Sequence, residues 1–254
     1  MKLWREREDD SEVARTLRRL SHANRLLGLH KEGVQQAEEA LEIYERLNDT
    51  FGQAHSLRDL AWSLYDDHRL DAAEEVTLQS IDLLPERVDQ SLVCQRQHLL
   101  GLIHSSKGEV EKAVNHFEAA LRIASSFDWH GAQFWDHYSL AELFSNQGRF
   151  SDSHAHVERA KLHAVNNMYH MGRVMHLQAE FWCKQRRFRD ARSEALCAVD
   201  AYEKVGATRY LEICRNFIRD VEEEMEEPTT SREPDFDGEL LDTVPPPTYI
   251  NLLF

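Results

Sequence analysis

The sequence has few cysteines, few prolines and no long apolar run. Its four cysteines, Cys94, Cys183, Cys197 and Cys214, include no CxxC pair, so neither a disulfide framework nor a zinc ribbon is indicated. The N-terminal residues are charged rather than apolar, unlike a secretory signal. No stretch approaches the roughly 20 apolar residues that a membrane helix requires. These absences favour a soluble protein with reduced thiols, and we expect a cytoplasmic location.

Positive charge is also scarce. The chain has 30 basic and 45 acidic residues, which gives a net charge of -15. Binding to nucleic acid requires a basic surface, so we expect neither nucleic acid nor a membrane as a partner. Three common site motifs are missing as well: the GxxxxGK[ST] phosphate loop, the GxGxxG turn and the GxSxG elbow. We therefore expect no catalytic residues, no cofactor and no enzymatic activity.

Fourteen histidines are the remaining source of site chemistry. His154 and His156 are two residues apart, so they point to different sides of a helix. His156 and His163 share a face but lie two turns, about 10 Å, apart. Helical metal ligands are usually spaced four residues apart. We expect no metal site, and an enzyme or metal protein with a histidine-lined site is the least favoured alternative.

What the chain does contain is a repeat of about 40 residues. The clearest copy is GEVEKAVNHFEAALRI, residues 108–123, and related segments occupy 28–43, 68–83, 148–163 and 186–201. A fixed period of this length indicates an array in which each repeat packs against its neighbours. Apolar residues recur at spacings of three and four, so each repeat is predicted to be a helix, a turn and a second helix.

Three aligned positions hold a small residue in all five copies. Small side chains allow two helices to approach to the short end of the ~8–10 Å range of interaxial distances. The fifteen residues are Ser21, Ala61, Gly101, Ala141 and Ala179; Gly33, Ala73, Ala113, Ser153 and Ala191; and Ala40, Ser80, Ala120, Ala160 and Ala198. Next to the first position we expect large apolar side chains to fill the core, at Leu20, Leu60, Leu100 and Leu140.

This pattern resembles the tetratricopeptide repeat (TPR), and the third copy matches it well. The matching residues are Leu100, Gly101, Gly108, Ala113, Phe117, Ala120 and Leu121. The resemblance implies an all-α fold, a right-handed α-solenoid of about five repeats with a C-terminal capping helix. The expected organisation is a charged lead-in (1–13), repeats within 14–204 (14–46, 54–86, 94–126, 134–166 and 172–204), a capping helix (205–227) and a disordered tail rich in proline and acid (228–254).

In this family the first helix of each repeat lines a concave groove that binds proteins or peptides. Carrying the family's groove positions over to this chain gives a set rich in Arg, Trp and Tyr, the residues that dominate binding hot spots. The set is Arg15, Arg18, His22, Arg25, His55, Arg58, Trp62, Tyr65, His98, Trp135, Tyr138, Glu142, Arg173 and His176. Its basic N-terminal end predicts a protein or peptide ligand of acidic character. Alternatively, Trp62 and Trp135 pack between repeats, and Arg15 and Arg18 pair with acids such as Glu12.

A narrower resemblance is carried by VARTLRRLSHANRLLGLHKEGVQQAEEALEIYERLND and HYSLAELFSNQGRFSDSHAHVERAKLHA. These phrases are similar to the TPR arrays of NOD-like receptors in basidiomycete fungi, where the array follows a NACHT or NB-ARC domain. The resemblance implies a sensor or regulatory array that acts with an attached or partner NTPase domain. A self-associating structural TPR adaptor is the alternative among interaction proteins.

Overall fold

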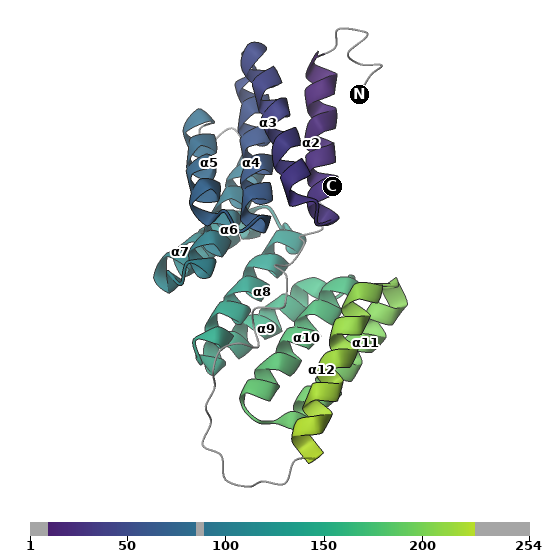
Figure 1. The fold of residues 1–254 in the computed structure, drawn as a ribbon. Helices are drawn as coiled ribbons and strands as arrows, with labels where there is room; N and C mark the ends of the chain where they lie inside the picture. The colour runs from purple at the N-terminus through teal and green to yellow at the C-terminus, as the bar shows by residue number, and fades with distance from the viewer. Residues whose placement is uncertain (1–9, 85–88, 227–254) are drawn as a thin grey trace. The chain divides into compact units, whose positions relative to one another are not determined.

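A computed structural model of the chain describes residues 10–84 and 89–226, and this part contains helices and no strands (Figure 1). The predicted all-α fold class is therefore confirmed. The helices are α2 (Asp10–Leu26), α3 (His30–Arg46), α4 (Thr50–Asp66), α5 (Leu70–Leu83), α6 (Gln90–Ser106), α7 (Val110–Ser126), α8 (His130–Asn146), α9 (Phe150–Ala164), α10 (Met168–Lys184), α11 (Phe188–Val205) and α12 (Thr208–Glu226).

The helices fall into two compact units with a boundary between Ile123 and Ala124. In the first unit α2 pairs with α3 and α4 with α5, and the helices α2, α4 and α6 also contact one another in sequence. In the second unit α8 pairs with α9, α10 pairs with α11, and α8 contacts α10. We call α2, α4, α6, α8 and α10 the first helices of their repeats, and α3, α5, α7, α9 and α11 the second helices.

Most of the described helices end on the same left-handed turn, which lies at residues 28, 48, 68, 108, 128, 148, 186 and 206. Glycine occupies it at residues 28, 108, 148 and 206, with φ from 67° to 78°. The following N–H bonds to a carbonyl five residues back, as from Leu29 to Asn24 at 2.8 Å, which is the Schellman pattern. In the other turns of this kind the residue with positive φ is Asn48, His68, Asp128 or Arg186. A left-handed conformation costs a non-glycine residue about 1–2 kcal/mol.

All fifteen small residues are buried, which confirms that they lie where helices pack closely. Several of them also hydrogen bond to the backbone of the facing helix. Ser21 Oγ donates to the Gly33 carbonyl at 2.7 Å, and Ser153 Oγ donates to the Ala141 carbonyl at 2.8 Å. Ser21 occupies the first aligned small position and bonds to the second, whereas Ser153 occupies the second and bonds to the first. A small hydroxyl therefore satisfies a buried carbonyl without separating the helices.

Leu20 departs from its expected place in the core, because it is 38% exposed. Its counterparts Leu60, Leu100 and Leu140 are buried. Leu60 lies on α4, which packs against α3 of the preceding pair. Among the described residues no helix precedes α2, so the side of α2 that carries Leu20 lacks such a neighbour.

The first helices begin four residues earlier than the predicted repeats. Residues 10–13, expected in the lead-in, form the first turn of α2. The side chains of Asp49, Asp89 and Asn167 accept hydrogen bonds from the N–H groups of Gly52, Leu92 and His170, so these residues are N-caps. The helix α12 falls within the expected capping segment, whereas the tail 228–254 and residues 1–9 of the lead-in lie outside the described residues.

Candidate binding surface

On the first helices of the first unit, the predicted cations contact an acidic side chain. Arg18 Nε donates to Asp59 Oδ2 at 2.7 Å, and Arg58 Nε donates to Asp59 Oδ1 at 3.0 Å. Arg58 Nη1 also donates to Gln95 Oε1 at 3.1 Å, so the network crosses α2, α4 and α6. Burial by itself would raise the pKa of Asp59, but Arg58 and Arg18 outweigh it and lower that pKa. Asp59 is therefore ionised and holds two guanidinium groups.

A deeper ion pair joins Arg25 on α2 to Asp66 on α4. Arg25 Nη1 lies 2.9 Å from Asp66 Oδ2, and each side chain is 2% exposed. The guanidinium carbon of Arg25 also lies 5.0 Å from the ring centroid of Trp62. Burial raises the pKa of Asp66, against the opposing charge of Arg25. Arg25 thus supports the packing of two helices and presents little charge at the surface.

Arg15 lies on the exposed side of α2 and forms an ion pair with Glu12 on the same helix. This is the arrangement that the alternative interpretation anticipated for Arg15. Among Arg18, Arg58 and Asp59, the two cations and one anion leave a net charge of about one positive. The N-terminal end of the predicted groove is therefore less basic than a count of its arginines indicates.

Two histidines of this surface, His22 and His55, are neutral at pH 7. Burial, followed by the charge of Arg25, lowers the pKa of His22. Burial, followed by the charges of Arg58 and Arg18, lowers the pKa of His55 to about 4. These two imidazoles therefore add no charge to the surface at neutral pH.

The predicted aromatic residues bridge neighbouring first helices. In the first unit the ring centroids of Trp62 on α4 and His98 on α6 lie 6.1 Å apart, and Tyr65 packs edge-on against Trp62 at 6.2 Å. In the second unit Trp135 on α8 packs edge-on against His170 on α10 at 5.2 Å. All five side chains are largely buried. They therefore contribute to packing between repeats, as the alternative interpretation anticipated for Trp62 and Trp135.

In the second unit, Arg173 lies in a group of tyrosines. Its Nη2 donates to Tyr138 Oη at 2.9 Å, and its guanidinium carbon lies 5.0 Å from the Tyr138 ring and 5.2 Å from the Tyr210 ring. Arg173 is 6% exposed, and its Nε has no hydrogen-bond partner in the described residues. Within that part of the chain no carboxylate lies within 4 Å of it. The site thus holds a buried cation without an ion-pair partner.

Beyond Arg173 the same surface becomes acidic. Burial, followed by the neighbouring charge of Glu180, raises the pKa of Glu142 on α8, and burial raises the pKa of Glu180 on α10. Burial also lowers the pKa of Lys184, against the attraction of both carboxylates. Burial and the charge of Arg173 lower the pKa of His176 to about 4. The surface therefore brings two basic groups, Arg173 and Lys184, close to two carboxylates.

The sequence interpretation missed several partners of the predicted site residues. Asp59 and Asp66 lie seven residues apart on α4, opposite Arg18 and Arg25, which are also seven apart on α2. This matched spacing is the signal that a search for charge pairs between repeats would find. The tyrosine Tyr210 was missed because it belongs to α12, beyond the last aligned copy.

Other site types find no support in the described residues. There, no group of three or more His, Cys, Asp or Glu side chains is arranged to hold a metal ion. None of the helices in 10–84 and 89–226 combines the length and apolar character needed to cross a membrane.

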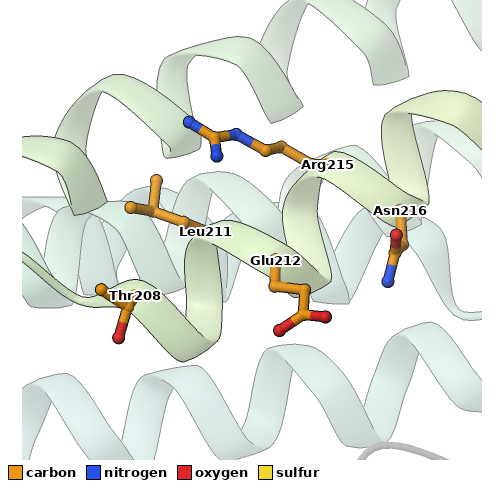
Figure 2. A pocket seen from close by; sticks show the side chains of 5 residues that line it. All are labelled: Thr208, Leu211, Glu212, Arg215 and Asn216. Carbon is orange, nitrogen blue, oxygen red and sulfur yellow. The ribbon is translucent and has the colours of Figure 1, made fainter.

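The helix α12 carries an open hollow of about 390 Å³. Its lining comes from Thr208, Leu211, Glu212, Arg215 and Asn216. In Figure 2 the side chains of Leu211 and Arg215 extend to one side of α12, and those of Thr208 and Glu212 to the other. The lining includes none of the residues predicted for the groove, so the hollow is a separate feature of the terminal helix.

Comparison with known proteins relates this architecture to one repeat family. Residues 12–86 and 95–127 match family models of the tetratricopeptide repeat. No curated protein sequence matches the chain.

Solved structures that share the fold include the following three. A Rap protein complexed with competence and sporulation factor has 13% identity and a TM-score of 0.63, over 86% of this chain and 66% of that chain. Aspartyl phosphate phosphatase F from Bacillus subtilis has 12% identity and a TM-score of 0.62, over 89% and 64%. A putative kinesin light chain from Podosopora anserina, with nearly identical TPR-like repeats, has 16% identity and a TM-score of 0.52, over 86% and 99%.

The chain spans about two thirds of the first two of these proteins, and at such low identities the likeness is one of fold. The repeat assignment rests on the matched segments and on the helix pairs that continue their pattern. Residues 12–86 and 95–127 therefore match the tetratricopeptide repeat, and the helix pairs from His130 to Val205 continue the same helical architecture.

Proposed function

We propose that this chain is a non-catalytic scaffold that binds a protein or peptide segment on the first helices of its repeats. Arg173 carries the proposal, because it is a buried guanidinium with an unsatisfied Nε and no carboxylate within 4 Å in the described residues. Leaving a buried charge without a partner is costly. A carboxylate of a bound segment would supply that partner. The Rap relative was solved with competence and sporulation factor, so a protein of this fold can hold another molecule.

The surroundings of Arg173 define the chemistry of the proposed ligand. An acidic side chain would pair with Arg173, with Tyr138 and Tyr210 contacting the adjacent apolar part of the segment. A basic side chain next to it would pair with Glu142 and Glu180, whose pKa values burial raises. In the first unit the net positive charge around Asp59 also favours an acidic residue. The proposed ligand therefore carries acidic residues with at least one basic neighbour.

Selection from a random peptide library displayed on phage tests this proposal. The wild-type chain is compared with Arg173→Met and with Arg189→Met, a control on the exposed side of the second helix α11. We expect peptides with Asp or Glu to bind the wild type and the control, and to lose about 10-fold or more in affinity for Arg173→Met. This loss corresponds to roughly 1.4 kcal/mol or more. Circular dichroism checks that the variants retain their helices.

Two outcomes would contradict the proposal. One is that Arg173→Met, with its helical content intact, binds the selected peptides as tightly as the wild type does. The other is that binding of the selected peptides is lost when an exposed residue of a second helix, such as Arg189, is replaced, but not when Arg173 is replaced.

From the sequence resemblance alone, we propose that the array serves as the sensor or regulatory part of a fungal NOD-like receptor. It would act with an attached or partner NTPase domain and transmit ligand binding to it. Sequencing the complete transcript and capturing partners of the tagged chain test this proposal. An NTPase domain in the same reading frame, or an NTPase among the captured proteins, is expected. Finding neither would refute the receptor assignment and leave the binding proposal intact.

A further inference from the structure

Four histidines meet between α8 and α9 in the second unit. His130 and His137 lie on α8, and His156 and His163 lie on α9. The Nδ1 atoms of His137 and His156 are 3.0 Å apart, and those of His130 and His163 are 3.3 Å apart. The rings of His137 and His163 stack with centroids 5.8 Å apart, which connects the two pairs. We call these four residues the histidine ladder.

Each short contact of the ladder requires at least one neutral ring. Between two Nδ1 atoms, one imidazole must donate a hydrogen bond and the other must accept it. A protonated imidazole has two donors and no acceptor, so charging both members of a pair breaks its hydrogen bond. Two positive charges at this separation also repel each other. The packing of α8 on α9 is therefore linked to the protonation of these rings.

The electrostatic surroundings strengthen this link. Burial, followed by the neighbouring charges of His156, His163 and Arg159, lowers the pKa of His137 to about 3. Burial, followed by the charge of Arg159, lowers the pKa of His156 to about 4. Burial and the charge of His130 lower the pKa of His163. The folded second unit thus resists protonation of these three rings.

The charges that face the ladder come from α9. Arg159 opposes protonation of His137 and His156, and Asp152 favours protonation of His156 to a smaller extent. The helix α10 also packs against α8 and α9, but none of its charged groups acts on the pKa of His137, His156 or His163 in the described structure. Asp152 does not outweigh the effects that lower the pKa of His156, so protonated rings of the ladder would have little charge compensation.

We propose that the histidine ladder is an acid-sensitive latch that joins α8 to α9 at neutral pH and opens when its paired imidazoles are protonated. An unfolded histidine has a pKa of about 6.5, above the lowered pKa values of His137, His156 and His163 in the folded chain. Between about pH 6.5 and pH 4 the unfolded chain therefore binds more protons than the folded chain. Consequently, the free energy of unfolding of the second unit is highest above this window and falls as the pH decreases through it.

Thermal unfolding of the full chain at pH 7.5 and pH 5 tests the latch. The double variant His137→Phe/His156→Phe keeps two aromatic rings in place but cannot titrate. The control His154→Gln removes an exposed histidine of α9 that lies outside the ladder. We expect the wild type and the control to lose roughly 5–10 °C in Tm on acidification, and the double variant to lose less than half of that.

Comparison among the variants isolates the ladder, because burial also lowers the pKa values of His55, His170 and His176. An equal loss of Tm in the double variant and the wild type would overturn the proposal. A second measurement does not depend on any variant folding. Titration of the imidazole signals of the wild-type protein by NMR should show that His137 and His156 remain neutral down to about pH 5. Midpoints near 6.5 for both residues would equally refute the latch.

Discussion

Replacing Gly101 with alanine should destabilise the first unit, because the added methyl group has no space. A Cβ at Gly101 on α6 would lie 2.6 Å from both Cδ1 and Cε1 of Phe117 on α7. Phe117 is fully buried, so its ring cannot move towards solvent. Overpacking of this kind costs about 1–3 kcal/mol, and the helix propensity of alanine returns about 0.5–1 kcal/mol. We expect a net loss of about 1–2 kcal/mol.

The repeats themselves suggest the compensating change. At the aligned positions the fourth repeat holds Ala141 with Val157 instead of Gly101 with Phe117. Phe117→Val alone should leave a cavity and cost about 2–4 kcal/mol. The double variant Gly101→Ala/Phe117→Val recreates the pair of the fourth repeat, so its loss should be smaller than the sum of the two single losses by at least about 1 kcal/mol.

Urea unfolding followed by circular dichroism measures these free energies. Gly131→Ala is the matched control, since a Cβ there would meet no atom within 4 Å. This control should be neutral or gain up to about 1 kcal/mol. The argument that Gly101 and Phe117 are matched in size would be refuted by additivity. In that case the double variant would lose the sum of the two single losses in free energy of unfolding, within about 0.5 kcal/mol.

Three further predictions concern turns, ion pairs and caps. His68→Gly and Arg186→Gly should each stabilise the chain by about 1 kcal/mol, because both residues have positive φ; an unchanged urea midpoint would contradict this. Asp66→Asn should destabilise the first unit by about 3–5 kcal/mol, since it leaves Arg25 buried without its carboxylate, and near-neutral unfolding data would show that the pair is dispensable. Asp49→Ala should cost about 1 kcal/mol through loss of the α4 N-cap, while Asp49→Ser should restore most of the loss in the same melting assay.

The repeat pattern predicted most of the fold, because its small residues are tied to one geometric requirement. A position where two helices touch accepts only glycine, alanine or serine, whatever the rest of the repeat contains. Helix starts were less predictable: the caps Asp49, Asp89 and Asn167 lie outside the apolar period, and a single polar side chain carries each signal. The left-handed turns were predictable where glycine occurs, whereas residues such as His68 and Arg186 give no sequence signal for a positive φ.

The candidate site was predictable only in part. The groove positions of the family assign Arg18, Arg58 and Arg173 to one predicted surface. Nothing in the sequence next to each arginine indicates that their surroundings differ. In the structure Arg18 and Arg58 share Asp59, whereas Arg173 lies among tyrosines without a carboxylate within ion-pairing distance in the described residues. Arg58 and Asp59 are neighbours on α4, but Arg18 and Arg173 meet their partners from helices about 40 residues away in the chain. The outcome therefore depends on which side chains the packing of repeats brings together.

The sequence alone determined the helix pairs, their period and the close-packed positions, because short-range geometry fixes each of them within one repeat. Tertiary structure alone decided the state of the charged and titratable groups. Ionisation depends on burial and on charges only a few ångströms away. For the arginines and for the histidine ladder, those neighbours come from other helices, and only packing defines those distances.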